Sequence, residues 1–302
     1  AEVTGTLKTD TGSLSFSSFT HTEQMAHIIE LQTGGEEKMP QFVWESPDFV
    51  TCSFWNTTYF KNPSCPPPVR TREGDFHLHA QKLAKESGEF AVVWRVVPGR
   101  TGRAVVYLAV GYSHQAGAAR TEALDAVKAA MAAGIENLRA THRAWWHNYY
   151  PASFLSIPDA RLESFYWIQI YRMASSTRAD RVPMDNLSGP WYPLGPYPWM
   201  HIHWDLNIQL IHWPMMGANR LDIGESFYRM LDKNADNLIR NAGPYCSDSA
   251  GIGVESGYDC ISGGVEEYKF HPFWLGSLPW AMHNYWLQYR HSMDDERLRK
   301  NL

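Results

Sequence analysis

Short apolar runs alternate with turn-forming residues in the first third of the chain, and this pattern predicts β-strands. Three runs rich in β-branched and aromatic residues are the clearest, namely Gly12–Phe19, Phe90–Val97 and Ala104–Val110. The last two runs are separated by Pro98-Gly-Arg-Thr-Gly102, so we expect them to pair as a hairpin. Residues 1–112 are therefore predicted to form a β-sandwich-like domain.

The pattern changes to that of a helix from Glu122 onward. Residues 122–150 contain many alanines and other strong helix formers, and no proline occurs before Pro151. This segment predicts a helix that connects two domains, within a linker assigned to residues 113–158. Asp159 is then well placed to cap a second helix, whose apolar residues on nearly every side indicate burial among other helices.

Residues 159–302 are predicted to alternate helices with long loops. The expected helical segments are 204–217, 222–241, 274–291 and one that begins near Asp294. The loops at 183–203 and 242–273 are rich in glycine, proline and aromatic residues. Ordered loops of this length usually carry function, so the candidate site is sought there.

Composition narrows the class of protein. The chain has 302 residues, of which 44% are hydrophobic and 20% charged, as expected of a globular protein with two domains. A net charge of -5 offers no basic surface for phosphate backbones, so a nucleic-acid partner is not expected. No stretch approaches the roughly 20 apolar residues that a membrane span needs. A neutral polar ligand fits this composition better.

The four cysteines form two close pairs, Cys52 with Cys65 and Cys246 with Cys260. Each pair spans a Pro- or Gly-rich segment that permits a local disulfide, which would favour a secreted or periplasmic location. Four reduced thiols, compatible with the cytoplasm, fit the spacing equally well. The first residues lack the regions of a signal peptide, which leaves a processed or truncated start open.

Tryptophans concentrate in the predicted helical domain, where ten of the 13 lie between Trp145 and Trp286. An indole ring covers the C–H face of a sugar while its N–H binds a polar partner. Trp191, Trp199 and Trp204 fall in or beside the first long loop and are the candidates for a sugar-binding cleft. Core packing is the alternative explanation for each of them.

The densest polar and aromatic stretch enters the predicted helix at 204–217, and it brings His201, His203, Asp205 and Asn207 to the start of that helix. Asp205 and Asn207 can address one point only if they lie at the mouth of the helix, beside its free backbone N–H groups. There they could orient a water or a sugar hydroxyl. Two alternatives are that Asp205 caps the helix and that His201 and His203 bind zinc, although no third zinc ligand is evident.

Glycosidic cleavage requires an acid for the leaving oxygen and a second group that acts as a nucleophile or activates water. The candidate carboxylates are Asp185, Asp205, Glu225, Glu255, Asp259, Glu266 and Glu267. Glu225 on a helix is less favoured than Glu255 and Asp259, which lie in a Gly-rich loop. It is also less favoured than Glu266 and Glu267, which precede an aromatic run that contains His271. We predict that Glu255 and His271 bind substrate, with solvated surface positions as the alternative for the acids.

Several blocks of this chain resemble a known family. Arg161–Arg178, Asp185–Trp191, Asp205–Pro214 and Phe273–Arg290 are similar, in this order, to glycoside hydrolase family 95, which includes α-L-fucosidases and L-galactosidases. The resemblance implies a β-sandwich domain, a helical linker and an (α/α)6 toroid that removes a terminal sugar with inversion. No cofactor or metal is expected.

The resemblance also implies roles for individual residues. The family positions its attacking water with an Asn-x-Asn pair and a distant aspartate, and a later glutamate is the general acid. Asn207 matches the second asparagine, whereas Asp205 stands where the family has the first. An aspartate could itself take a proton from water or hold a sugar hydroxyl, so we predict Asp205 and Asn207 as the catalytic pair.

The predicted helices are too few for a closed toroid of six hairpins. We therefore expect the chain to be a piece of a longer polypeptide, with the general acid beyond Leu302. Two other functions stay open at this point. One is another toroidal glycosidase, α-glucosidase-like or rhamnosidase-like, and the other is a noncatalytic carbohydrate-binding protein.

Overall fold

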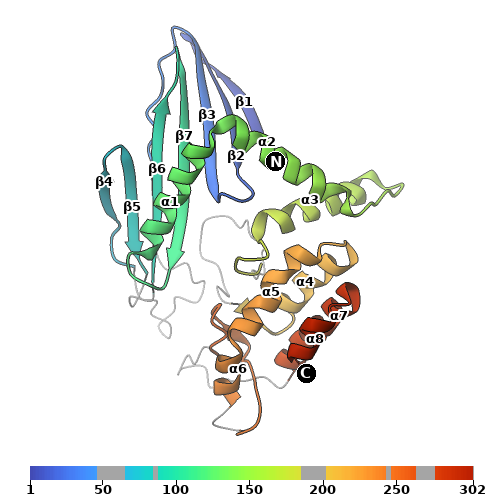
Figure 1. Cartoon of the computed structure of the whole chain (residues 1–302). Coiled ribbons are helices and arrows are strands. Elements are labelled where there is room, and N and C mark those ends of the chain that lie inside the picture. Colours follow the sequence, from blue (N-terminus) through green and yellow to red (C-terminus); the bar gives the residue numbers. More distant parts are fainter. Residues whose placement is uncertain (46–64, 84–87, 185–201, 243–245, 263–275, 302) are drawn as a thin grey trace, which may run out of the picture. The chain divides into compact units, whose positions relative to one another are not determined.

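The computed structural model describes residues 1–45, 65–83, 88–184, 202–242, 246–262 and 276–301. They divide into two compact units, one that ends at Tyr149 and one that begins at Tyr150. The first unit contains a large β-sheet, and the second consists mainly of helices (Figure 1). None of the helices in the described part of the chain is long and apolar enough to cross a bilayer.

The first unit is built on a seven-stranded antiparallel sheet with the order β1-β2-β3-β7-β6-β5-β4. Its strands are β1 (Val3–Lys8), β2 (Gly12–Thr20), β3 (Ala26–Gly35), β4 (Val69–Glu73), β5 (Phe76–Lys82), β6 (Glu89–Pro98) and β7 (Arg103–Ser113). The three predicted strands correspond to β2, β6 and β7, which confirms them. The predicted hairpin is also confirmed, because β6 and β7 pair with Val92 opposite Val110.

A helix, rather than a second sheet, packs on this sheet in the described residues. Helix α1 (Ala118–Ala133) lies along β6 and β7 (Figure 1), and its Val127 packs in the same buried cluster as Ile28 and Val93. Gly111 on β7 allows this close approach, since a Cβ there would lie 2.1 Å from the backbone oxygen of Ala119. The β-rich first unit is thus confirmed, and its described residues form one sheet covered by a helix.

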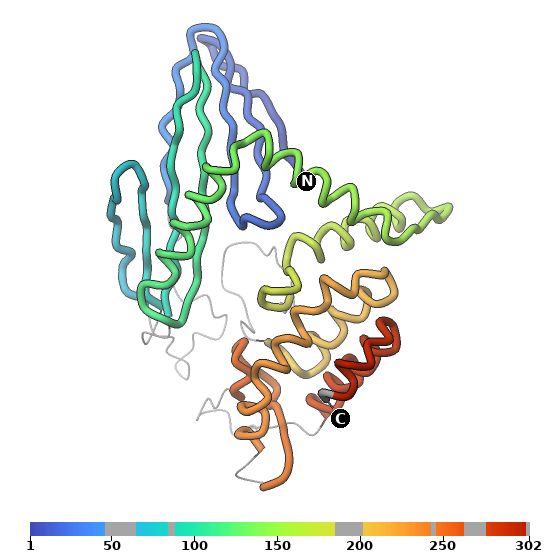
Figure 2. The backbone as a smooth tube through the Cα atoms, viewed as in Figure 1, coloured from blue at the N-terminus to red at the C-terminus, as the bar shows by residue number. Residues whose placement is uncertain are grey.

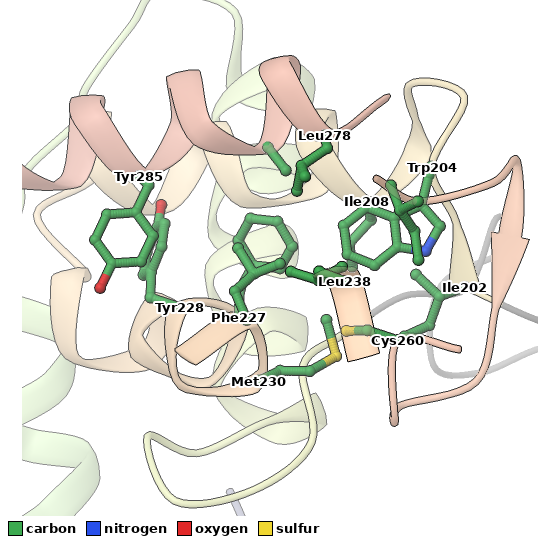
Figure 3. Close-up of a cluster of buried hydrophobic side chains, with 13 residues drawn as sticks. Ile202, Trp204, Ile208, Phe227, Tyr228, Met230, Leu238, Cys260, Leu278 and Tyr285 are labelled. Carbon is green, nitrogen blue, oxygen red and sulfur yellow. The ribbon is translucent and has the colours of Figure 1, made fainter. Parts of the chain in front are cut away.

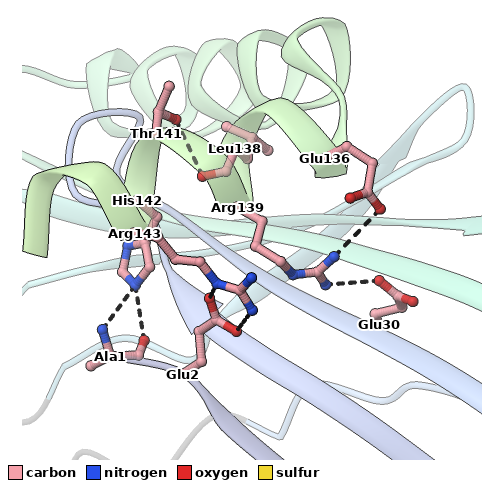
Figure 4. A network of polar contacts seen from close by, with 9 residues as sticks. All are labelled: Ala1, Glu2, Glu30, Glu136, Leu138, Arg139, Thr141, His142 and Arg143. Atoms are coloured by element: carbon pink, nitrogen blue, oxygen red, sulfur yellow. Dashed lines mark hydrogen bonds and ion pairs between the residues drawn. The ribbon is translucent and has the colours of Figure 1, made fainter. Parts of the chain in front are cut away.

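Most of the predicted linker, residues 113–149, belongs to the first unit, and residues 150–158 belong to the second. The expected helix at 122–150 is divided at Gly134, whose φ of +75° ends α1 before α2 (Ile135–Tyr149) begins. Charged contacts tie α2 to the sheet (Figure 4): Arg139 donates to Glu30 of β3 at 2.9 Å, and Arg143 binds Glu2 at 2.6 Å. The structural boundary therefore follows Tyr149, whereas the composition placed boundaries at 112 and 158.

The second unit opens with α3 (Ala160–Ser176). The Asp159 side chain accepts hydrogen bonds from the backbone N–H groups of Arg161 and Leu162, at 2.9 and 3.1 Å, which confirms the predicted N-cap. The later helices are α4 (Asn207–Gly217), α5 (Leu221–Lys233), α6 (Ala235–Ala242), α7 (Ser277–Ser292) and α8 (Asp295–Asn301). The segment predicted as one helix at 222–241 is thus interrupted at Asn234.

Helices α4, α5 and α7 pack against one another (Figure 2). Their buried side chains contribute to the core of the second unit. Helix α8 is held by Arg297, which forms a two-point ion pair with Glu225 of α5 and lies over the ring of Tyr285 of α7. Glu225 thus has a structural role in holding α8 against α5.

The second cysteine pair does not form a disulfide. Cys246 and Cys260 are both free thiols, the first exposed and the second buried. Burial raises the pKa of Cys260 to about 12, so this thiol stays protonated at neutral pH. Cys52 of the other pair lies outside the described residues.

Candidate active site

A two-stranded ribbon leads into α4. Strand β8 (Ile202–His203) pairs antiparallel with β9 (Glu255–Ser256), so that Ile202 lies opposite Ser256 and His203 opposite Glu255. The backbone N–H of Trp204 extends the pairing by donating to the oxygen of Val254 at 2.8 Å. Because side chains alternate along a strand, Ile202 and Trp204 share the face that packs into the core.

Trp204 is a core residue, which corrects its assignment to the sugar cleft. Its side chain is 0% exposed, and its indole N–H donates to the Ser256 hydroxyl at 2.8 Å. The ring packs near Phe227, with centroids 6.1 Å apart (Figure 3). Since no part of the ring is open to solvent, it has no surface for a sugar. Core packing, the alternative for this tryptophan, is what the structure shows.

The chain between β8 and α4 turns at Asp205 and Leu206 and enters α4 at Asn207. We call these three residues the Asp205 turn. Asp205 and Leu206 are exposed, and Asn207 is half-buried at the first position of α4. Leu206 adopts φ 99° and ψ −31°, a conformation that costs a residue with a side chain on the order of 1–3 kcal/mol. The N-cap position belongs to Leu206, so Asp205 does not serve as the cap of α4.

His203 and Glu255 form a pair beside this turn. The Nε2 atom of His203 lies 3.1 Å from Oε1 of Glu255, with 9% and 32% of the two side chains exposed. The partly exposed carboxylate of Glu255 is thus held in place by a nearly buried imidazole. This arrangement suits a carboxylate that accepts a hydrogen bond from a sugar hydroxyl, and substrate binding by both residues stays a prediction.

Four other predicted substrate contacts, Trp191, Trp199, His201 and His271, lie outside the described residues. The alternative that His201 and His203 bind zinc also depends on a residue outside the described ones, His201. Among the other candidate acids, the carboxylate of Asp259 accepts from the backbone N–H of Ile261 at 3.0 Å, a local turn contact. Asp185, Glu266 and Glu267 also lie outside the described residues.

Sequence reasoning missed a group of buried polar side chains beneath the Asp205 turn. Gln209 and Asn284 are 0% exposed, and His212 is 1% exposed. Gln209 Nε2 donates to the backbone oxygens of Trp204 and Ser277, at 2.8 and 3.2 Å. Asn284 Nδ2 donates to the oxygen of Gln209 at 2.8 Å. In the sequence, the polar residues Gln209 and His212 within the otherwise apolar segment 208–216 could have indicated this buried group.

His212 makes the stability of the second unit depend on pH. Its Nδ1 atom lies 2.8 Å from the oxygen of Ile208, its ring stacks on Phe227, and burial lowers the pKa of His212 to about 4. An unfolded histidine titrates near 6.5, so between these values the unfolded chain binds a proton that the folded chain does not. The stability that the second unit gains from keeping His212 neutral is complete above pH 6.5 and is lost as the pH falls toward 4.

We therefore expect the free energy of unfolding to fall by up to roughly 3 kcal/mol between pH 6.5 and 4 on account of His212. The measurement is denaturant unfolding at several pH values for the native protein and for His212→Gln. The difference between the two slopes of unfolding free energy against pH gives the part that is due to His212. His142→Gln gives the same comparison for the first unit, since burial also lowers the pKa of His142 to about 4. Equal slopes for the native protein and His212→Gln would contradict the expectation.

The fold and the site together define a class of protein: a β-sheet unit followed by a helical unit, with an exposed acid at the mouth of a core helix. Residues 137–302, more than half of the chain, match the glycosyl hydrolase family 95 catalytic domain. The chain belongs to this family, which confirms the resemblance seen in its sequence blocks.

One solved structure shows the fold over nearly the whole chain. It is described as a kojibiose phosphorylase from human microbiome, and it aligns with a TM-score of 0.57 and 11% sequence identity. The match covers 98% of this chain and 41% of that chain, so this chain spans less than half of its structural neighbour. At this identity the likeness concerns the fold alone. No curated protein is detectably similar to the chain.

Proposed function

We propose that the protein is a glycoside hydrolase that removes a terminal sugar from an oligo- or polysaccharide with inversion, and that α-L-fucosides are its first substrate class. The observation that carries the proposal is the exposed carboxylate of Asp205 on a strained turn at the start of α4, in a chain of the family 95 catalytic domain. Strained backbone persists where surrounding contacts hold it, and such positions cluster at active sites.

In this proposal Asp205 and Asn207 act on one water molecule. An inverting glycosidase delivers water to the face of the sugar opposite the leaving group, and a base removes the proton of that water. A carboxylate can take this proton, whereas an amide can only orient the water through its oxygen and NH2 group. Asp205 is therefore the base and Asn207 the orienting group, and a second carboxylic acid protonates the leaving oxygen.

The helical unit is proposed to form the first part of an (α/α)6 toroid. The mutual packing of α4, α5 and α7 and the fold of the structural neighbour support this proposal. In such a toroid the Asp205 turn would face the central cleft, and the Glu255 carboxylate would bind a hydroxyl of the terminal sugar.

The test is a panel of nitrophenyl glycosides assayed with the full-length protein, each with and without inorganic phosphate. We expect release of nitrophenol from the α-L-fucoside at a rate that phosphate does not change. Turnover of an α-glucoside only with phosphate would replace the proposal with phosphorolysis, the activity named for the structural neighbour. Sugar binding without turnover of any glycoside would replace it with a carbohydrate-binding function.

A further inference from the structure

The backbone of the Asp205 turn is anchored by contacts on its buried side. The residue before Asp205, Trp204, uses its N–H, its carbonyl oxygen and its indole N–H in three hydrogen bonds, to Val254, Gln209 and Ser256. Two of these partners belong to the segment that carries β9, and the third lies in α4. The carbonyl of Trp204 belongs to the peptide group that leads into Asp205, so Gln209 acts on the turn itself.

Gln209 is held in turn by α7. Its side chain bridges the oxygens of Trp204 and Ser277, and its backbone oxygen accepts from Asn284. Asn284 is fixed by the indole N–H of Trp213, which donates to its Oδ1 atom at 2.6 Å, and by the hydroxyl of Tyr228, which donates to its backbone oxygen. All of these side chains except Trp213 are buried. The buried amide of Gln209 thus connects the turn to α7.

The side chain of Gln209 places the peptide group that leads into the Asp205 turn. Its Oε1 atom is buried and has no hydrogen-bond partner among the described residues. Its two Nε2 bonds fix the Trp204 carbonyl, at the start of the Asp205 turn, relative to the oxygen of Ser277 at the start of α7.

We infer that Gln209 is a positioning residue that holds the Asp205 turn in its strained conformation and so aims Asp205 and Asn207 at the reacting sugar. The inference rests on the proposed function for its kinetic consequence, whereas its structural consequence is independent of any activity. A displacement of about 1 Å in a catalytic group can lower turnover by about a hundredfold.

The test compares Gln209→Met with Gln288→Met in the full-length protein. Methionine keeps the volume of glutamine and removes the N–H donors. Gln288 is the matched control, because it lies buried on α7 and also donates to a backbone oxygen, that of Leu221 at 3.3 Å. We expect Gln209→Met to lower kcat by about 10- to 100-fold with little change in KM, and Gln288→Met to leave kcat within about twofold.

A double-mutant cycle with Asp205→Ala separates placement from general destabilisation. If Gln209 acts through Asp205, Gln209→Met adds little to the loss already caused by Asp205→Ala. Amide hydrogen exchange of residues 202–210 gives a second readout, and we expect faster exchange there in Gln209→Met than in Gln288→Met. Faster exchange in a protein that cleaves no glycoside would refute the proposed function and support the placement role. Unchanged exchange together with unchanged kcat would overturn the inference.

Discussion

Asp205→Asn is expected to lower kcat on the preferred glycoside by about 10²–10⁴-fold, the usual contribution of a general base. The change replaces one carboxylate oxygen with an NH2 group of the same size at an exposed position, so the fold is unaffected. An amide can still orient water but cannot take its proton, so the loss measures proton transfer alone. Steady-state kinetics at saturating substrate give the result.

Asp222→Asn is the matched control for this experiment. Asp222 is likewise exposed and lies in the first turn of a helix of the same unit, α5. Its replacement changes the net charge equally, and kcat is expected to stay within about twofold because surface substitutions act weakly. Full turnover in Asp205→Asn would show that Asp205 is not the base, and the roles of Asp205 and Asn207 would then have to be assigned afresh.

Trp204→Ala is expected to reduce the free energy of unfolding by about 3–5 kcal/mol, as for other large aromatic side chains removed from a core. The indole is fully buried next to Ile202, Ile208 and Phe227 (Figure 3), and its removal leaves a cavity under the Asp205 turn. Trp204→Phe keeps much of the packing and loses the hydrogen bond to Ser256, so we expect a smaller loss, of about 1–2 kcal/mol. Chemical denaturation measures both values.

Trp286→Ala provides the comparison for an exposed tryptophan. Trp286 lies on α7 with 45% of its surface exposed, so its replacement is expected to cost less than about 1 kcal/mol. Similar destabilisation by Trp204→Ala and Trp286→Ala would contradict the buried position of Trp204. A Trp204→Ala protein of native stability with a raised KM would instead restore Trp204 to the sugar cleft.

Local sequence patterns were sufficient to predict several elements of this fold. Alternation of apolar residues identified β6 and β7, and the residues Pro98–Gly102 identified their turn, because a hairpin is set by contacts close in sequence. The cap at Asp159 is likewise a contact over three residues. The break at Gly134 was also readable locally, because glycine commonly ends helices.

Long-range packing decided what local patterns could not. The sequence of α1 predicted a linker. Its packing on the sheet depends on Gly111 of β7, which local patterns within the helix do not reveal. Trp204 looked like a cleft residue because its inward direction is fixed by pairing with a strand that begins at Glu255, far along the chain. Gln209 escaped notice for the same reason, since no sequence pattern shows which backbone oxygen a buried amide will reach.

The most direct measurement is a crystal structure of the full-length Asp205→Asn protein with uncleaved glycoside bound. We expect the terminal sugar to lie over the Asp205 turn, with one water between the anomeric carbon and the side chains at positions 205 and 207. The carboxylate of Glu255 should accept a hydrogen bond from a hydroxyl of the same sugar. A sugar bound elsewhere, with the side chain at position 205 in contact with solvent alone, would contradict the proposed site.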